Sequence, residues 1–240
     1  MKAARIRAYG DLGGAVVEDV PVPEVGPHEV LIRVVAASIN PLDIKLIGGG
    51  LDAYFPLAFP YSLGTDLAGT VERAGALAAR WRPGDTVIAR ADPVRGGAFA
   101  EFAVVPATRV AAAPAGLPLA VAAGLPTAAG TAWQALFETA CLSAGQTVLI
   151  HAAAGGVGSA AVQLARCAGA RVVATASAAN ADLVRRLGAS HVIDYRTEDF
   201  TAMVRDVDVV LDIIGGDTQQ HSLRRAAARR EAGQHRVAAG

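Results

Sequence analysis

A run of small residues carries the clearest chemical signal in the sequence. Ala152-Ala-Ala-Gly-Gly-Val-Gly158 would form a turn in which glycines let the backbone approach a pyrophosphate closely. The free N–H groups at the start of a following helix would then face the negative charge. This chemistry is the binding of a dinucleotide cofactor. The candidate cofactor-binding residues are Ala153, Gly155, Gly156, Val157 and Gly158, together with Gly215 further along the chain.

The elements on both sides of this turn have the order that phosphate binding requires. Thr147–His151 is a short apolar run rich in β-branched residues, which is typical of a buried parallel strand. Ser159–Arg166 places apolar residues at helical spacing, and Arg171–Thr175 predicts a second strand. This order predicts the phosphate-binding corner of a dinucleotide fold. The alternative is a tight strand-to-helix turn that binds no ligand.

The end of the second predicted strand bears on the choice of cofactor. NAD-dependent enzymes usually place a carboxylate there to bind the ribose 2′-hydroxyl, whereas this strand ends in Val173-Ala-Thr-Ala-Ser177 without an acid. A 2′-phosphate would not be repelled, and Ser177 and Asn180 could donate hydrogen bonds to it. We therefore predict NADPH rather than NADH. The alternative is that Ser177 or Asn180 only caps a helix.

The composition excludes several classes of protein. Of 240 residues, 52% are hydrophobic and 18% are charged, which supports a large core and argues against disorder. Lys plus Arg equal Asp plus Glu at 22 each, so net charge favours neither nucleic acid nor an anionic membrane as a partner. We find no apolar run long enough to span a bilayer, no signal-peptide core and, with two cysteines, no disulfide framework. We expect a cytoplasmic protein.

The order of the predicted elements divides the chain into two domains. Residues 1–113 contain many short strands with Gly/Pro turns, which is typical of a barrel or sandwich. Residues 114–126 are predicted to form a hinge. In residues 127–240 a helix at Thr127–Leu142 is followed by alternating strands and helices, which predicts an α/β fold with a doubly wound parallel sheet. Its expected strands are Thr147–His151, Arg171–Thr175, His191–Asp194 and Val207–Ile214.

Several motifs, in a fixed order, resemble one family. They are Ala37-Ser-Ile-Asn-Pro-Leu-Asp43, Leu63-Gly-Thr-Asp-Leu-Ala-Gly69, Arg82-Pro-Gly-Asp85, Gly97-Ala-Phe-Ala-Glu-Phe102, Gly130-Thr-Ala-Trp133, the glycine turn and Leu187-Gly-Ala-Ser-His-Val-Ile-Asp-Tyr195. From residue 1 to about residue 223 the chain resembles the zinc-independent medium-chain dehydrogenases/reductases of the quinone oxidoreductase type. The resemblance implies an N-terminal chaperonin-10-like β-barrel domain followed by a Rossmann domain.

The resemblance also implies an activity and further site residues. Members transfer a hydride from NADPH to a quinone or to the double bond of an α,β-unsaturated carbonyl, and full-length members are expected to form homodimers. Tyr195 matches a family tyrosine that lies against the 2′-phosphate or the adenine. Relatives often carry Lys or Arg where this chain has Ala179, so Arg185 or Arg196 would have to compensate.

A catalytic zinc ion is not expected. Zinc-dependent relatives carry Cys near Asn40 and His at the position of Thr65, and this region offers neither residue type. A catalytic zinc site needs about three N, S or O ligands. Asp66 alone cannot supply them.

Three residues are the catalytic candidates. Hydride transfer needs orientation and a group that steadies the developing oxyanion. Asn40 is the first candidate, as an amide donor in the cleft between the domains, and Lys45 is the second, as a cation near an enolate oxygen. Thr131 is expected to touch the nicotinamide end. The alternatives are a turn role for Asn40 before Pro41 and a solvated side chain for Lys45.

Other reactive side chains are expected to be structural. His151 ends a buried strand, and Cys141 and Cys167 are expected to be small core residues. No acid stands out as a proton donor, so solvent is the expected proton source.

The C-terminal segment departs from the family. After Leu223, eleven of 17 residues are Arg or Ala, where relatives would show an apolar segment, a Pro-Gly-Gly-type turn and a strand. We expect the last sheet strands and the return to the barrel domain to be missing, which would leave Val207–Ile214 as an aggregation-prone sheet edge. A frameshift or misassigned gene end would explain this. The alternative is a genuine basic helix that covers the edge.

Two other functions compete with the reductase. The chain could bind the cofactor without turnover, because part of the cleft is expected to be missing. It could also have the structural or nucleic-acid-binding role of some relatives, which its neutral charge balance disfavours.

Overall fold

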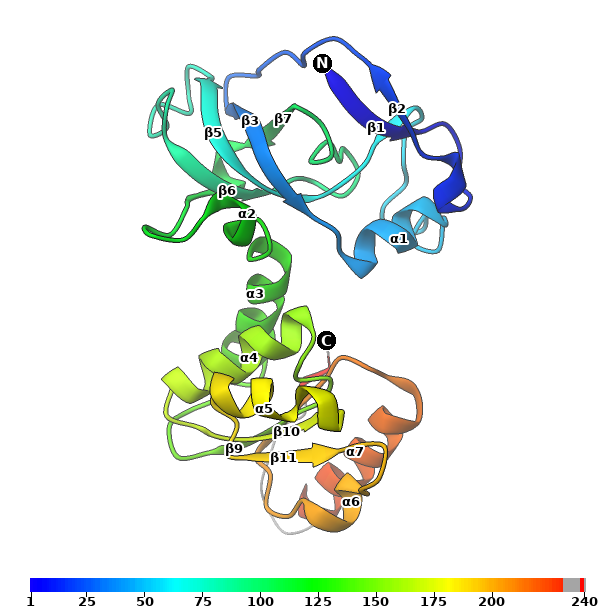
Figure 1. Ribbon diagram of the computed structural model, residues 1–240, viewed down its shortest axis with the longest axis vertical. Helices are drawn as coiled ribbons and strands as arrows, with labels where there is room; N and C mark the ends of the chain where they lie inside the picture. Colours follow the sequence, from blue (N-terminus) through cyan, green and yellow to red (C-terminus); the bar gives the residue numbers. More distant parts are fainter. Residues whose placement is uncertain (231–237, 240) are drawn as a thin grey trace. The chain divides into compact units, whose positions relative to one another are not determined.

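The chain folds into two compact units, Met1–Thr127 and Ala128–Gly240. The structure is a computed structural model, and it describes residues 1–230 and 238–239. Figure 1 labels many of the helices and strands of each unit. Each unit builds its own hydrophobic core, so each is described by itself.

Two antiparallel sheets form the first unit. One has three strands in the order β2-β1-β4, and the other has five in the order β7-β3-β5-β6-β8. The strands are β1 (Lys2–Ile6), β2 (Val16–Asp19), β3 (Glu29–Ser38), β4 (Tyr61–Ser62), β5 (Asp66–Ala74), β6 (Thr86–Arg90), β7 (Phe102–Pro106) and β8 (Val110–Ala112). Short helices connect them: η1 (Leu12–Gly14), α1 (Pro41–Ile47), η2 (Ala107–Arg109) and α2 (Leu119–Ala122).

The pairing of β3 with β5 forms the centre of this unit. Val30 and Ile32, two residues apart on β3, share a core with Leu67 of β5, because alternate side chains of a strand lie on the same face. A Cβ at Gly69 would lie 2.1 Å from the carbonyl oxygen of Arg33, so this close approach of the two strands requires glycine. The many short strands predicted for this part of the chain are confirmed.

A five-stranded parallel sheet forms the centre of the second unit, in the order β11-β10-β9-β12-β13. Its strands are β9 (Thr147–Ile150), β10 (Arg171–Ala176), β11 (His191–Asp194), β12 (Val209–Asp212) and β13 (Ala238–Ala239). The helices are α3 (Pro126–Trp133), the π-helical turn η3 (Gln134–Thr139), α4 (Gly156–Cys167), α5 (Ala178–Leu187), α6 (Phe200–Met203) and α7 (Gly216–Arg230). In Figure 1, α4 and α5 lie on one face of the sheet and α6 and α7 on the other. The prediction of a doubly wound parallel sheet is confirmed.

The strands of this sheet bury both faces. Val148 and Ile150 of β9 pack into the core that includes residues of α4 and α5. Leu149, between them, packs with Val173 and with Phe200 of α6 in a separate cluster. Because both faces are covered, the strand reads as a continuous apolar run, which is the pattern that predicted it.

Two expectations about the second unit are wrong. Cys141 and Cys167 are exposed rather than part of the core, since one follows η3 and the other ends α4. The strand β12 is also not the sheet edge, because Leu211 and Asp212 pair in parallel with Ala238 and Ala239 of β13. A fifth strand is therefore present.

The expectation about the C-terminal segment after Leu223 falls partly outside the described residues. Helix α7 begins before the Arg/Ala-rich segment and ends at Arg230, and residues 231–237 and 240 are not described.

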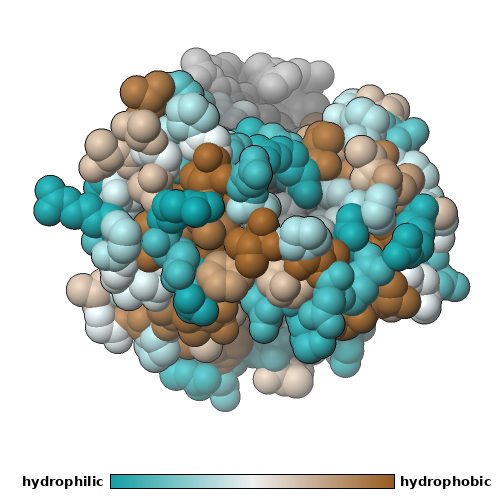
Figure 2. All heavy atoms as spheres, turned by 90° about the horizontal axis from the view of Figure 1, so that it is seen from above, coloured by the Kyte–Doolittle hydropathy of each residue, from teal (hydrophilic) through white to brown (hydrophobic). Residues whose placement is uncertain are grey.

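The surface mixes side chains of opposite character. Figure 2 shows hydrophilic and hydrophobic residues interspersed in small patches over the face in view. Within residues 1–230 and 238–239, no helix is both long and apolar enough to cross a membrane.

Candidate functional site

The glycine turn joins β9 to α4 through a tight backbone. Ala152 has a positive φ of 48°, and the N–H of Gly155 donates to its carbonyl oxygen at 2.9 Å. Gly155 is the extended N-cap residue of α4. A Cβ at Gly158 would lie 2.3 Å from that same Ala152 oxygen, so only glycine fits there.

This corner leaves backbone donors for an anion. The first N–H groups of a helix have no partner within the helix, and at the start of α4 they belong to Gly156, Val157 and Gly158. Ala153 is fully buried and ties the turn to β10 through its N–H, which donates to Thr175 O at 3.0 Å. The corner therefore fits a pyrophosphate at the start of α4.

The carboxyl end of β10 carries no acid in the structure. Ser177 is the N-cap residue of α5, but its hydroxyl makes no capping hydrogen bond. Asn180 lies in the first turn of α5 and is exposed. Tyr195 is also exposed, and the guanidinium of Arg196 lies 5.8 Å from its ring centre. These groups leave hydroxyl and amide donors available for a phosphate.

Arg185 is engaged elsewhere. Its Nη1 lies 2.8 Å from the Asp182 carboxylate on the same helix. The guanidinium of Arg196 instead lies over the ring of Tyr195.

A second turn follows β12, the neighbour of β9. Asp212 is buried, and its Oδ1 accepts hydrogen bonds from the N–H groups of Ile214 at 2.8 Å and Gly215 at 3.1 Å. Gly215 has a φ of 78°, which favours glycine. The carboxyl ends of β9 and β12 lie where the strand order reverses, which is where doubly wound sheets bind ligands. Gly215 was predicted from the sequence as a cofactor-binding residue. Asp212, whose carboxylate holds this turn, was not predicted.

His151 is a structural residue in this geometry. Its ring is buried, with Thr175 Oγ1 and Ser222 Oγ each 3.1 Å from a ring nitrogen. The Phe200 ring contacts it edge-on at 4.7 Å between centroids. Burial lowers the pKa of His151, while the nearby charge of Asp212 opposes this shift. His151 thus ties β9 to β10 and α7 in its neutral form.

The first unit gathers polar residues around Asp66, whose side chain is fully buried. Asp66 Oδ2 accepts from Asn40 Nδ2 at 3.2 Å, from Ser38 Oγ at 3.4 Å and from the N–H of Thr127 at 2.8 Å. Asp66 Oδ1 accepts from Thr127 Oγ1 at 2.7 Å, and Arg90 Nε donates to that same hydroxyl at 3.1 Å. The partners come from β3, the start of α1, β6 and the start of α3.

A second carboxyl group lies beside this network. Asp43, in the first turn of α1, is buried and accepts from the backbone N–H of Asn40 at 2.7 Å. Burial raises the pKa of Asp43; the hydrogen bond from Asn40 opposes this rise, and the charge of Asp66 adds to it. Sequence analysis found no acid, because only the fold buries this one.

The structure places two of the three catalytic candidates on α1 and the third on α3. Asn40 is the N-cap residue of α1, and Lys45 lies exposed on the same helix without an ion pair to any described residue. Thr131 is half-buried on α3, in the second unit. Asp43 and Thr127 were not predicted as site residues from the sequence, and Asp66 was considered only as a metal ligand. The motif that contains Asp66 was the available signal.

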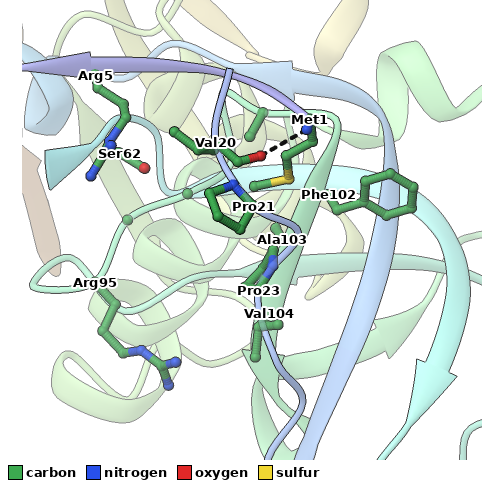
Figure 3. A pocket seen from close by; sticks show the side chains of 13 residues that line it. Met1, Arg5, Val20, Pro21, Pro23, Ser62, Arg95, Phe102, Ala103 and Val104 are labelled. Atoms are coloured by element: carbon green, nitrogen blue, oxygen red, sulfur yellow. Dashed lines mark hydrogen bonds between the residues drawn. The ribbon is translucent and has the colours of Figure 1, made fainter. Parts of the chain in front are cut away.

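A shallow pocket of the first unit lies away from these candidates. Figure 3 shows its lining, which includes Arg5, Pro21, Arg95 and Phe102. Both arginines are paired with carboxylates, Arg5 with Glu18 at 3.0 Å and Arg95 with Glu29. The candidate catalytic residues do not line it.

A metal site is not evident in the described part of the chain. Residues 1–230 and 238–239 contain no group of three or more His, Cys, Asp or Glu side chains that could hold a metal ion.

Comparisons with known proteins give two family matches. Residues 26–115 match the alcohol dehydrogenase GroES-like domain, and residues 156–231 match the zinc-binding dehydrogenase family. The chloroplastic quinone-oxidoreductase homolog of Spinacia oleracea is 40% identical over 205 residues, which cover 83% of this chain and 62% of that protein. The chain therefore spans less than two thirds of the length of this relative.

Solved structures agree with these matches. The quinone oxidoreductase of Coxiella burnetii superposes with a TM-score of 0.87 at 32% identity, covering all of this chain and 82% of the other. The Escherichia coli quinone oxidoreductase, solved with NADPH, gives a TM-score of 0.86 at 25% identity and covers all of this chain and 81% of the other. With its GroES-like and Rossmann-like units, the chain belongs to the quinone oxidoreductase family of the medium-chain dehydrogenases/reductases.

Proposed function

We propose that the chain is an NADPH-dependent oxidoreductase that reduces a quinone, or the double bond of an α,β-unsaturated carbonyl, without a metal. The observation that carries this proposal is the glycine turn at Gly155–Gly158, which forms the start of α4 and leaves the first backbone N–H groups of that helix for an anion. When bound, the nicotinamide cofactor supplies the hydride. The protein's task is then to hold the cofactor, orient the acceptor and steady the charge that develops on its oxygen.

The preference for NADPH rests on the end of β10. An acidic residue there would repel a 2′-phosphate, and this chain has Ser177 with a hydroxyl that makes no capping bond. We propose that Ser177, Asn180 and Tyr195 contact the 2′-phosphate, that Arg196 adds positive charge, and that Gly215 lies beside the cofactor at the strand-order reversal.

The catalytic groups in this proposal are Lys45, Asn40 and Thr131. The exposed ammonium of Lys45 would stabilise the oxyanion that forms when the acceptor takes the hydride. Thr131 would orient the nicotinamide end. The absence of Cys and His near Asn40 and Thr65 supports chemistry without zinc.

Two measurements test this function. Calorimetric titration with NADPH and with NADH should show tighter binding of NADPH. NADPH oxidation should then be followed with a panel of quinones and of enones. Binding without turnover on either panel would favour a cofactor-binding protein, and equal affinity for the two cofactors would contradict the assignment of the 2′-phosphate site.

The glycine turn has its own test. Gly155→Val places a branched side chain where backbone would meet phosphate. The extended backbone at Gly155 accepts a side chain, but its Cβ would lie 3.3 Å from the Ala152 carbonyl oxygen, a tight contact. NADPH affinity should be lost, while the melting temperature should fall only modestly. Unchanged affinity would rule out the phosphate-binding assignment.

A further inference from the structure

The network around Asp66 fixes the direction of its hydrogen bonds. An ionised carboxylate only accepts hydrogen bonds, so Ser38, Asn40 and Thr127 must each donate to it. Thr127 uses its single hydroxyl hydrogen on Asp66 Oδ1, and it accepts from Arg90 on its other side. The charge of Arg90 therefore lies one hydroxyl group away from the Asp66 carboxylate.

The same reasoning fixes the amide of Asn40. Ser38 directs its only hydroxyl hydrogen to Asp66, so its oxygen accepts from Asn40 Nδ2, 3.3 Å away. The second N–H of that amide points to Asp66 Oδ2 at 3.2 Å. A flipped amide would bring Asn40 Oδ1 against a carboxylate oxygen with no hydrogen between them. Both N–H groups of Asn40 are thus used inside the protein. Its side-chain oxygen also faces the backbone N–H of Asp43 in the capping box of α1, so one of the two lone pairs of Oδ1 remains for a further donor.

We propose that Asp66 is a positioning residue that locks the Asn40 amide, so that Asn40 offers its Oδ1 as a hydrogen-bond acceptor. Its partner would be an O–H or N–H group of the bound cofactor or of the reduced substrate. This inference rests on the proposed function and changes the predicted role of Asn40 from donor to acceptor. Stabilising the oxyanion then falls to Lys45.

The Asn40→Asp variant separates an acceptor from a donor. The new carboxyl group would face Asp66 of β5 and Asp43 of α1, with Arg90 of β6 acting through Thr127. Like charges raise the pKa of such a group. While protonated, it donates its O–H to Asp66 and still presents a carbonyl oxygen, as the amide does.

An acceptor role predicts a pH profile that the wild type lacks. The variant's kcat/KM should be substantial at low pH and fall about tenfold per pH unit above the pKa of the new carboxyl group. If Asn40 instead acts by donating an N–H, the variant should be inactive at every pH. That result would overturn the proposal.

A double-mutant cycle tests whether Asp66 acts through Asn40. Asp66→Asn keeps the shape of the side chain but removes the carboxylate that, together with the capping box of α1, orients the Asn40 amide. The kcat of this variant should fall about tenfold, which is within the range of couplings between contacting residues. In an Asn40→Ala background the same change should have little further effect on kcat. Additive losses would show that Asp66 is merely structural.

Thr127→Val is the matched control for this cycle. It removes the hydroxyl between Asp66 and Arg90 but leaves the contact of Asp66 with Asn40. It should lower the melting temperature yet affect kcat less than Asp66→Asn does. An equal loss of kcat would mean that Asp66 acts by anchoring Thr127.

Hydrogen exchange of the Asn40 side chain, measured by NMR without turnover, tests this inference separately from the proposed function. The side-chain NH₂ resonances of Asn40, identified by their loss in Asn40→Asp, should exchange slowly in the wild type and faster in Asp66→Asn. Unprotected resonances in the wild type would overturn the proposal. Protected resonances without reductase activity would instead refute the function. A weaker NADPH affinity in Asn40→Ala would assign the donor to the cofactor, and an unchanged one to the substrate.

Discussion

At the scale of the residue, Lys45 is the side chain with the most direct test. It is exposed on α1 and forms no ion pair with the described residues, so its charge is available to a ligand. If it stabilises charge that exists only in the transition state, Lys45→Ala should lower kcat more than it raises KM. Lys45→Arg, which keeps the charge, should recover part of kcat. A change in KM alone would limit Lys45 to substrate binding.

Asp43 gives a second prediction at this scale, for stability. Burial raises its pKa above the unfolded value, so the folded protein binds an extra proton and loses stability as pH rises through the folded pKa. Asp43→Asn removes this titration and keeps an oxygen for the Asn40 N–H. The free energy of unfolding of the variant, relative to wild type, should therefore improve as pH rises above about 4. Urea unfolding at several pH values measures it, and a constant difference would contradict it.

At the scale of the element, Gly156 and Gly158 contribute differently to the turn between β9 and α4. A Cβ at Gly158 would overlap the backbone of Ala152, whereas at Gly156 it would lie 3.6 Å from the Ala128 Cβ, an ordinary contact. Gly158→Ala should therefore lower the melting temperature strongly. Gly156→Ala should leave it nearly unchanged or raise it, because alanine favours a helix. Similar melting temperatures for both variants would show that the turn relaxes freely.

At the scale of the whole molecule, the described residues offer no cluster of metal ligands in either unit. Neither stability nor turnover should then depend on a bound metal. Treatment with a chelator should leave the melting temperature and NADPH oxidation unchanged, and metal analysis should find less than stoichiometric zinc. A stoichiometric metal, or a loss of either property on chelation, would contradict the metal-free mechanism.

The sequence by itself determined the features that depend on short-range spacing. The run Thr147–His151 predicted a strand within a residue of its observed ends, because a strand buried on both faces needs a continuous apolar run. The glycine turn could be predicted for a similar reason, since its backbone conformation constrains only residues that are close together in sequence. The family resemblance then followed from motifs that are each local.

Only the tertiary structure decided which distant groups meet. Asp66 contacts Asn40 and Thr127, which lie 26 and 61 residues away in sequence. Spacing could not reveal that pairing, since it depends on how β5, the start of α1 and the segment at Thr127 pack within the first unit. The pairing of β13 with β12 could likewise not be predicted, because the two alanines of β13 have almost no strand propensity of their own. Hydrogen bonds and strand pairs between residues far apart in sequence depend on tertiary packing, which only the folded structure shows.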